Sequence, residues 1–396
     1  MSDEHEISRR HLLTLGAAAS ASALVGVGTA HANAADRYPQ VPRRVLGKTK
    51  QSIPLLLIGG GAGFKGSFDP RIALALKHGV NYVDTARSYA AGRSEPHAAR
   101  TLHKLKARDK TWITSKSGKW EAKGFARDVE FSLDSLKTTW VDLYFLHGLD
   151  DVSPLDDKDL IRTVERLKKD GKIRFFGFSC HDANVAELLH AAARRSYVDA
   201  VMFRYNFREY GNTELNRAID AAHKAGVGLI AMKTQGSEAS FRDAWKKFEQ
   251  TGRWNKHQAV LKAVWADQRI TAAVSHMTEL THVRENIAAA LDRHKLGKLE
   301  ADAVRRYADA TRPYACSGCD HICGAAVNAP VRIGATMRYL MYHDVYGERE
   351  QARALFRDLP PAARRLGAVD FSAANRACPH GVDVAAHMKR AGEVLV

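Results

Sequence analysis

The sequence has little cysteine, and the position of that cysteine excludes one class of protein. Only 5 of the 396 residues are cysteine, and four of them lie after residue 315. A small secreted domain held together by disulfides would carry cysteines along its whole length, so the chain is not of that class. With 45% hydrophobic and 26% charged residues, the composition is that of a globular protein able to bury a sizeable core.

Three other features are missing from the sequence. No Gly-x-Gly-x-x-Gly lies between an expected strand and an expected helix, which disfavours a Rossmann dinucleotide site. No His and Asp cluster with metal-ligand spacing follows the expected strands, which disfavours metal-dependent hydrolysis. The net charge of +16 is spread along amphipathic helices such as Arg162–Lys172, without a dense basic block. Because such charge is typical of solvated helix faces, we expect no nucleic-acid partner.

The N-terminus has the features of an export signal. Arg9 and Arg10 form a twin arginine, the weakly apolar run Leu12–Ala30 follows, and small residues suited to cleavage come next. The segment resembles a bacterial twin-arginine signal, whose translocon carries folded proteins. Residues 1–34 are therefore predicted to direct export to the periplasm or another extracytoplasmic location. The alternative is an uncleaved membrane anchor, because the uncharged run is about long enough to span a bilayer.

Short apolar runs alternate with helical patterns in the middle of the chain. The expected strands are Leu55–Ile58, Tyr82–Asp84, Trp112–Lys116, Val141–His147, Ile173–Ser179, Ala200–Tyr205, Val227–Met232 and Thr271–Val274. The expected helices are Pro70–His78, Glu95–Lys106, Phe125–Lys137, Leu160–Asp170, Asn184–Arg194, Thr213–Lys224, Gln258–Ala266 and His282–Leu291. The alternation favours βα units around a parallel sheet. Eight such units predict an α/β fold with a (β/α)8 TIM barrel, placed at residues 35–295.

Three successive expected strands deliver functional groups near their carboxyl ends. Asp84 ends one strand and Tyr89 follows on the next loop, while Lys116 and His147 end the two strands after it. In such barrels the active site lies at this end of the strands. These four residue types, in this order, resemble the catalytic tetrad of the aldo/keto reductases. The resemblance covers roughly residues 40–290.

The resemblance implies hydride transfer between NADP(H) or NAD(H) and a small carbonyl or alcohol substrate. Tyr89 would be the general acid/base, Lys116 would lower the pKa of its phenol, and Asp84 would orient Lys116. His147 would hydrogen-bond to the substrate oxygen and polarise it. Taken singly, each residue could also be an ion-paired, packed or capping side chain.

The same resemblance implies cofactor contacts after the fifth and sixth expected strands. Ser179 matches a serine that grips the nicotinamide carboxamide in the family, but His181 stands where most members have Asn. Arg204 lies near the position of a usual Gln and is a departure from the pattern. Tyr205 would supply a ring that stacks on the nicotinamide.

Contacts with the rest of the nucleotide would follow the last two strands. Lys233 is a candidate for a phosphate contact, and Glu285 and Asn286 match a pair that lies near adenine in the family. The segment that ends at Thr278 lacks the Arg or Lys that usually binds the 2′-phosphate, a group that needs a charge-assisted partner. NADP is the default of the family, and NAD stays open.

A mostly helical domain is expected at residues 296–396. It contains Cys316, Cys319, Cys323 and Cys378, the last followed by Pro379. These cysteines resemble a ferredoxin-like tail found on one branch of the aldo/keto reductases, which implies a single [4Fe–4S] cluster. The spacing departs from the usual compact run, since 54 residues separate the third cysteine from the fourth. Structural zinc, two disulfides and an unliganded remnant stay open as alternatives.

Together these features predict an exported oxidoreductase that works on a carbonyl or alcohol and exchanges electrons with a redox partner through its cluster. The alternative is a non-catalytic exported subunit for binding or electron transfer, with a decayed nicotinamide site. That alternative is motivated by His181, Arg204 and Thr278, where the chain departs from the family pattern.

Overall fold

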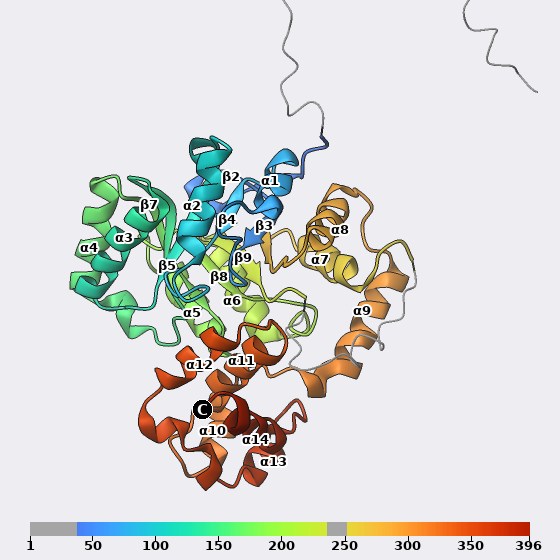
Figure 1. Cartoon of the computed structure of the whole chain (residues 1–396). Helices are drawn as coiled ribbons and strands as arrows, with labels where there is room; N and C mark the ends of the chain where they lie inside the picture. The colour runs from blue at the N-terminus through green and yellow to red at the C-terminus, as the bar shows by residue number, and fades with distance from the viewer. Residues whose placement is uncertain (1–37, 236–251) are drawn as a thin grey trace, which may run out of the picture.

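A closed barrel of parallel strands forms the centre of the protein (Figure 1). The computed structural model describes residues 38–235 and 252–396. The barrel strands are β3 (Leu56–Gly59), β4 (Tyr82–Asp84), β5 (Trp112–Ser117), β6 (Val141–Leu146), β7 (Ile173–Cys180), β8 (Ala200–Arg204), β9 (Gly228–Met232) and β10 (Ala272–Ser275). They are hydrogen-bonded in sequence order, and β10 closes the ring against β3. The predicted TIM barrel is confirmed, and each predicted strand lies within one residue of its observed bounds.

Helices surround the barrel, one after each strand. They are α1 (Pro70–Lys77), α2 (Ser94–Lys104), α3 (Ala122–Leu136), α4 (Lys158–Lys169), α5 (Val185–Ala193), α6 (Thr213–Lys224), α7 (Lys256–Ala266) and α8 (Leu280–Leu291). Side chains alternate along each strand, so one set packs against the helices and the other fills the barrel. Phe176 belongs to the outer layer, and Tyr82, Phe145 and Ile230 belong to the inner one.

A short hairpin closes the N-terminal end of the barrel. Strands β1 (Arg43–Val45) and β2 (Ser52–Pro54) pair antiparallel, and Leu46 and Ile53 add their side chains to the inner core. Gly47 has φ +46° and lies so close to Gly226 that a Cβ atom would stand 2.2 Å from the carbonyl oxygen of Gly226. Glycine is required there by both the conformation and the contact. With this end blocked, the opposite end is the accessible mouth of the barrel.

The C-terminal region is helical, as predicted, and it covers the mouth of the barrel. Helix α9 (Lys298–Thr311) packs on the side of the barrel through Val304 and Tyr307. Five further helices follow, α10 (Asp320–Ala326), α11 (Ile333–Asp344), α12 (Arg349–Arg357), α13 (Ser372–Ala377) and α14 (Val384–Val394). They share a separate core, and α11 and α12 lie between that core and the barrel (Figure 1).

The predicted export signal, residues 1–34, lies outside the described residues. Within residues 38–235 and 252–396, no helix combines the length and the apolar character needed to cross a bilayer.

Candidate active site at the barrel mouth

A buried ion pair lies under the mouth of the barrel. Asp84 is in register with Thr114 on the neighbouring strand, and Lys116, two residues further, points to the same side. The Lys116 Nζ atom donates to Asp84 Oδ1 at 2.6 Å and to the Thr85 carbonyl oxygen at 2.8 Å. The Lys116 side chain is only 1% exposed and that of Asp84 only 4%. Two of the predicted tetrad residues therefore form one desolvated pair.

Tyr89 and His147 complete the tetrad geometry above this pair. The Lys116 Nζ atom lies 4.8 Å from the centroid of the Tyr89 ring. The rings of Tyr89 and His147 meet edge to face, with their centroids 5.4 Å apart. The four residues predicted from the sequence thus gather at one place, at the carboxyl ends of β4, β5 and β6 and on the loop after β4.

Burial is the largest influence on the pKa values of Tyr89 and His147. It raises the pKa of Tyr89 well above 10, and the Asp84 carboxylate acts in the same direction. In the protein alone, burial outweighs any lowering of this pKa by the nearby Lys116 ammonium, and the expected effect of Lys116 stays a prediction. Burial, with a smaller effect from Lys116, lowers the pKa of His147 to about 3. At neutral pH the phenol is protonated and the imidazole is neutral.

A cavity of about 110 Å³ lies beside Asp84 and Tyr89 and opens to solvent. Its barrel side is lined by glycines after β3 and by the ends of β7, β9 and β10. Its other wall comes from the C-terminal domain, through Tyr342, Tyr346 and Glu348.

His181 belongs to this pocket, whereas Ser179 does not line it. The Ser179 side chain is 1% exposed, and its hydroxyl oxygen accepts from the Gly148 N–H at 3.0 Å, which fixes the loop after β6. The Nδ1 atom of His181 is buried without a hydrogen-bond partner among the described residues. Burial, together with Arg338 and Lys233, lowers the pKa of His181 well below 6.5.

Arg204 turns toward the C-terminal domain. Its guanidinium donates to the carbonyl oxygen of Cys316 at 2.8 Å, to the carbonyl oxygen of Ser317 and to Glu209 at 3.2 Å. These partners occupy the side chain, which ties the end of β8 to the first of the C-terminal cysteines. Arg204, which departs from the family pattern, therefore helps to pack the C-terminal domain against the barrel.

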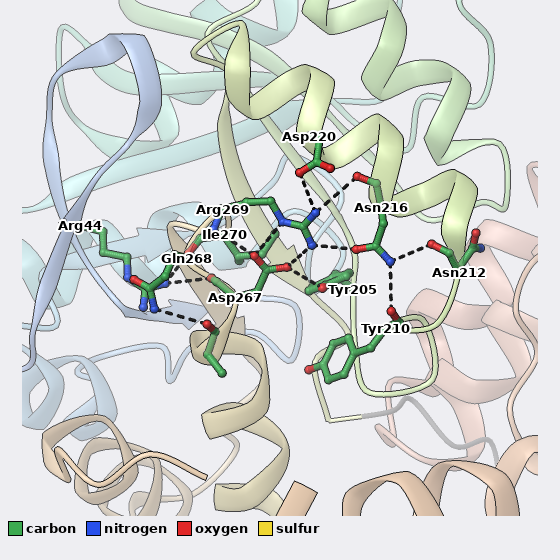
Figure 2. A network of polar contacts seen from close by, with 11 residues as sticks. Arg44, Tyr205, Tyr210, Asn212, Asn216, Asp220, Asp267, Gln268, Arg269 and Ile270 are labelled. Carbon is green, nitrogen blue, oxygen red and sulfur yellow. Dashed lines mark hydrogen bonds and ion pairs between the residues drawn. The ribbon is translucent and has the colours of Figure 1, made fainter. Parts of the chain in front are cut away.

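Tyr205 does not line the pocket, and its side chain joins a polar network on the flank of the barrel (Figure 2). Its hydroxyl donates to Asp267 Oδ2 at 2.7 Å, and Arg269 binds the same carboxylate at 2.7 Å. Arg269 also reaches Asn216 and Asp220, so the network joins α6 to the loop after α7 (Figure 2). The predicted nicotinamide-stacking role of Tyr205 is not compatible with this orientation.

Lys233 ends β9 and contacts two tyrosines of the C-terminal domain. Its Nζ atom lies 4.6 Å from the centroid of the Tyr342 ring and 4.9 Å from that of Tyr346. It also donates to the Tyr346 hydroxyl at 3.4 Å. Burial, with Arg338 acting in the same direction, lowers the pKa of Lys233 to about 7. Its backbone lies in the left-handed region, with φ +56°.

The predicted adenine-side pair lies on α8. Asn286 is 2% exposed, and its amide donates to the Ser275 hydroxyl oxygen at 3.0 Å. Ser275 lines the pocket, so Asn286 positions a pocket residue from behind. Glu285 is partly exposed, and its carbonyl oxygen accepts from Gln258 at 3.0 Å.

Sequence reasoning did not identify the residues through which the C-terminal domain forms a wall of the pocket. The His276 ring stacks on Tyr346 at a centroid distance of 4.3 Å, and its Nε2 atom lies 3.5 Å from Glu348. Arg338 pairs with Asp182, just after β7, at 3.2 Å. The run of tyrosines around α11 was a signal of packing, but nothing local indicated that it packs against the barrel mouth.

The four C-terminal cysteines line one further pocket, together with Pro379 and apolar side chains. All four are free thiols in the structure, which forms neither of the disulfides that were left open as an alternative. Among the described residues, no group of three or more His, Cys, Asp and Glu side chains is arranged to hold a metal ion. Backbone N–H groups of Gly318 and Val382 point to the sulfurs of Cys316 and Cys378, each at 3.4 Å.

Comparisons with known proteins agree with this geometry. Residues 67–299 match the model of the aldo/keto reductase family. An aldo-keto reductase from Gibberella moniliformis is 30% identical over 172 residues, which cover 41% of this chain and 50% of that protein. The chain thus spans about half the length of that curated relative.

Solved structures resemble the barrel. The holo form of an aldo-keto reductase from Bacillus halodurans superposes with a TM-score of 0.56 at 22% identity, covering 68% of this chain and 96% of that chain. An aldo-keto reductase from Klebsiella pneumoniae in complex with NADPH gives a TM-score of 0.54 at 21% identity. The match covers 68% of this chain and 94% of that chain. At these identities the likeness shows the fold.

Proposed function

We propose that this chain, which belongs to the aldo/keto reductase family, transfers hydride between a nicotinamide cofactor and a small carbonyl or alcohol substrate. The observation that carries the proposal is the desolvated Asp84–Lys116 pair below Tyr89, beside a pocket at the carboxyl ends of the strands. That end of a TIM barrel is where active sites are built.

The nicotinamide, when bound, supplies or accepts the hydride, and the residues of the chain handle the proton. In the reduction direction, the protonated Tyr89 phenol donates its proton to the carbonyl oxygen. The Lys116 ammonium, 4.8 Å from the ring centroid, stabilises the phenolate as it forms. His147, kept neutral by its lowered pKa of about 3, is suited to hydrogen-bond to the substrate oxygen without adding a charge.

NADP is the cofactor we propose first, with NAD as the alternative. The Klebsiella pneumoniae neighbour was solved with NADPH, which supports a nucleotide site in barrels of this kind. In this chain His181 and Lys233 line the pocket, and the unpaired Nδ1 atom of His181 can bind a polar ligand group. Ser179, Glu285 and Asn286 would support the pocket from behind or beside it. Arg204 and Tyr205 are held by other partners, the C-terminal domain and Asp267.

The test of the proposal is the variant Tyr89→Phe. Loss of the proton donor should reduce carbonyl-dependent oxidation of NADPH by about 10²- to 10⁴-fold, the range of general acid catalysis. Tyr342→Phe is the matched control, because it removes a hydroxyl from the same pocket. Equal activity of Tyr89→Phe and wild type would refute the tetrad assignment, and equal losses in both variants would refute a specific role for Tyr89.

We also propose that the C-terminal cysteines bind a [4Fe–4S] cluster. A tetrahedral zinc site with bonds of about 2.3 Å needs its sulfurs within about 4 Å of one another. Among the described residues no group is arranged for a single ion, and the four cysteines line one common pocket, in which a cluster would take one thiolate for each iron. The two N–H groups directed at sulfur are contacts that tune such clusters. The cluster would exchange single electrons with a redox partner.

Iron analysis after anaerobic purification tests the cluster. We expect a brown protein with roughly four irons per chain, and loss of the iron in Cys319→Ser. Cys180→Ser is the control, because Cys180 is buried at the end of β7, away from the cysteine pocket. A colourless, iron-free wild type prepared in this way would contradict the proposal.

For the N-terminal residues we propose export of the folded protein through the twin-arginine translocon. The cofactor and the cluster would then be inserted in the cytoplasm before export. Fractionation of cells that produce wild type or Arg9→Lys/Arg10→Lys tests this, since the variant should stay in the cytoplasm. Equal distribution of the two proteins would contradict export by this route.

A further inference from the structure

The loop that carries Tyr89 turns sharply just after it. The Gly92 N–H donates to the Tyr89 carbonyl oxygen at 3.1 Å, and the two residues between them, Ala90 and Ala91, have φ +51° and +52°. Positive φ at both central positions is the geometry of a type I′ turn, in which Asn and Gly are the usual residues. A side chain makes this conformation unfavourable, because the Cβ atom comes close to the following carbonyl oxygen. Two successive alanines therefore place a strained turn beside the proposed proton donor.

The barrel holds the base of this loop and lies against its turn. The Arg87 N–H donates at 3.2 Å to a carbonyl oxygen near the end of β5, and the Ser94 hydroxyl donates to the Gly60 carbonyl oxygen at 3.0 Å. Gly63, on the loop after β3, lies so close to Ala90 that a Cβ atom at Gly63 would stand 2.8 Å from the Ala90 Cβ atom. The loop after β3 thus blocks movement of the turn in that direction.

The C-terminal domain contacts the same turn through α12. The Ala90 N–H donates to Gln351 Oε1 at 3.1 Å, and Gln351 is only 8% exposed. Gln351 lies in the first turn of α12, and Phe356 of the same helix is buried in the core of the C-terminal domain. Arg93 and Glu350 form a second contact, an ion pair of 3.8 Å between exposed side chains, which contributes little. The hydrogen bond to Gln351 is therefore the contact that stabilises the turn.

From these contacts we propose that Gln351 is a positioning residue for Tyr89. The inference rests on the proposed role of Tyr89 as the proton donor. By accepting from the Ala90 N–H, Gln351 stabilises the strained turn, and this turn fixes the backbone from which the Tyr89 side chain extends over the Lys116 ammonium. Full activity then requires the C-terminal domain to be docked on the barrel mouth.

Two substitutions of Gln351 test the proposal. Gln351→Met keeps the length of the side chain but removes the acceptor oxygen, whereas Gln351→Glu keeps an acceptor. We measure reduction of 4-nitrobenzaldehyde, an activated carbonyl probe, with whichever of NADPH and NADH binds more tightly. In Gln351→Met, kcat should fall roughly 10-fold, the size of one hydrogen bond, with an unchanged KM for the nucleotide. Gln351→Glu should recover most of the loss.

Glu350→Gln is the matched control. It changes the neighbouring residue of the same helix and removes the exposed ion pair with the same turn of the loop. Its kcat should equal that of wild type. A loss as large as that of Gln351→Met would overturn the specific role of Gln351.

Relief of the strain distinguishes positioning from attachment of the domain. In the background Ala90→Gly/Ala91→Gly, the turn adopts positive φ without a steric penalty. Adding Gln351→Met to this background should lower kcat by less than about 2-fold, because the turn no longer depends on the hydrogen bond. An equal loss in both backgrounds would show that Gln351 only attaches the domain, and it would overturn the proposal.

Hydrogen exchange of the full chain, without a nucleotide, separates this inference from the proposed function. In Gln351→Met the amides of residues 89–94 should exchange roughly 10-fold faster than in wild type, while those of α14 keep their rates. This result supports the role of Gln351 at the turn even if no variant reduces a carbonyl, an outcome in which only the proposed function fails. Carbonyl reduction by wild type, with an unchanged kcat or unchanged exchange of the turn in Gln351→Met, overturns the inference alone.

Discussion

The two halves of the barrel mouth are built in different ways. At the ends of β4, β5 and β6, the functional groups contact one another, as the Lys116–Asp84 pair does. At the ends of β7 to β10, they contact the C-terminal domain instead, through Arg204, Lys233 and His276. The contacts of the first half are made within the barrel, apart from the loop that carries its tyrosine, and the second half is a shared surface with a domain that follows it in the chain.

The comparison explains where the chain departs from the pattern of its family. The tetrad half keeps all four residue types, because each of them depends on the others. The positions that depart, such as His181 and Arg204, belong to the half that packs against the C-terminal domain.

Removing the Lys116 ammonium, at the end of β5, should have the largest effect on stability and turnover. Lys116→Met leaves the Asp84 carboxylate buried without its partner, so we expect a loss of about 3–5 kcal/mol in the free energy of unfolding. Turnover should fall at least about 10²-fold. Urea unfolding and NADPH oxidation measure the two effects. The double variant Lys116→Met/Asp84→Leu should recover stability without activity, and a Lys116→Met protein as stable as wild type would contradict the account.

Substitutions at the ends of β7 to β10 should weaken the attachment of the C-terminal domain to the barrel. Arg204→Met removes charge-assisted contacts with the carbonyl oxygens of Cys316 and Ser317, and we expect a loss of about 1.5–3 kcal/mol. The C-terminal domain should become more sensitive to limited proteolysis. Arg332→Gln, which loses an exposed pair, should cost less than about 1 kcal/mol. Equal costs for the two variants would show that Arg204 does not hold the domain in place.

The smallest expected effect is on the dependence of stability on pH, to which one buried histidine of each half contributes, His147 after β6 and His181 after β7. The folded protein keeps His147 neutral down to a pKa of about 3, whereas the unfolded chain binds a proton near pH 6.5. Since the unfolded state binds more protons between these values, stability should decrease as pH falls from about 6.5 toward 3. Each such group contributes at most about 1.4 kcal/mol per pH unit.

Variants of the two histidines measure this contribution. Urea midpoints for wild type, His147→Asn and His181→Asn at pH 7, 5.5 and 4.5 would show a shallower decrease in each variant, because burial also lowers the pKa of His181. Identical slopes for wild type and both variants would mean that neither imidazole is kept neutral by the fold.

The sequence predicted the barrel and the tetrad for the same physical reason. Apolar runs with helical patterns between them define each strand within one residue, and the parallel topology brings Asp84, Lys116 and His147 to one end. The sequence could not predict that Tyr205 faces outward to Asp267, because strand register decides the side to which a residue points. It also could not predict contacts such as Lys233 with Tyr346, which join residues more than one hundred positions apart.

The most direct test of the central claim is a fluorescence titration of the purified protein with NADPH and then with NADH. The account predicts saturable binding of at least one nucleotide, even though part of the mouth contacts the C-terminal domain, and the tighter of the two identifies the cofactor. Binding of neither nucleotide would contradict it. The tetrad would then be a relic, and the chain would be better explained as a binding or electron-transfer subunit.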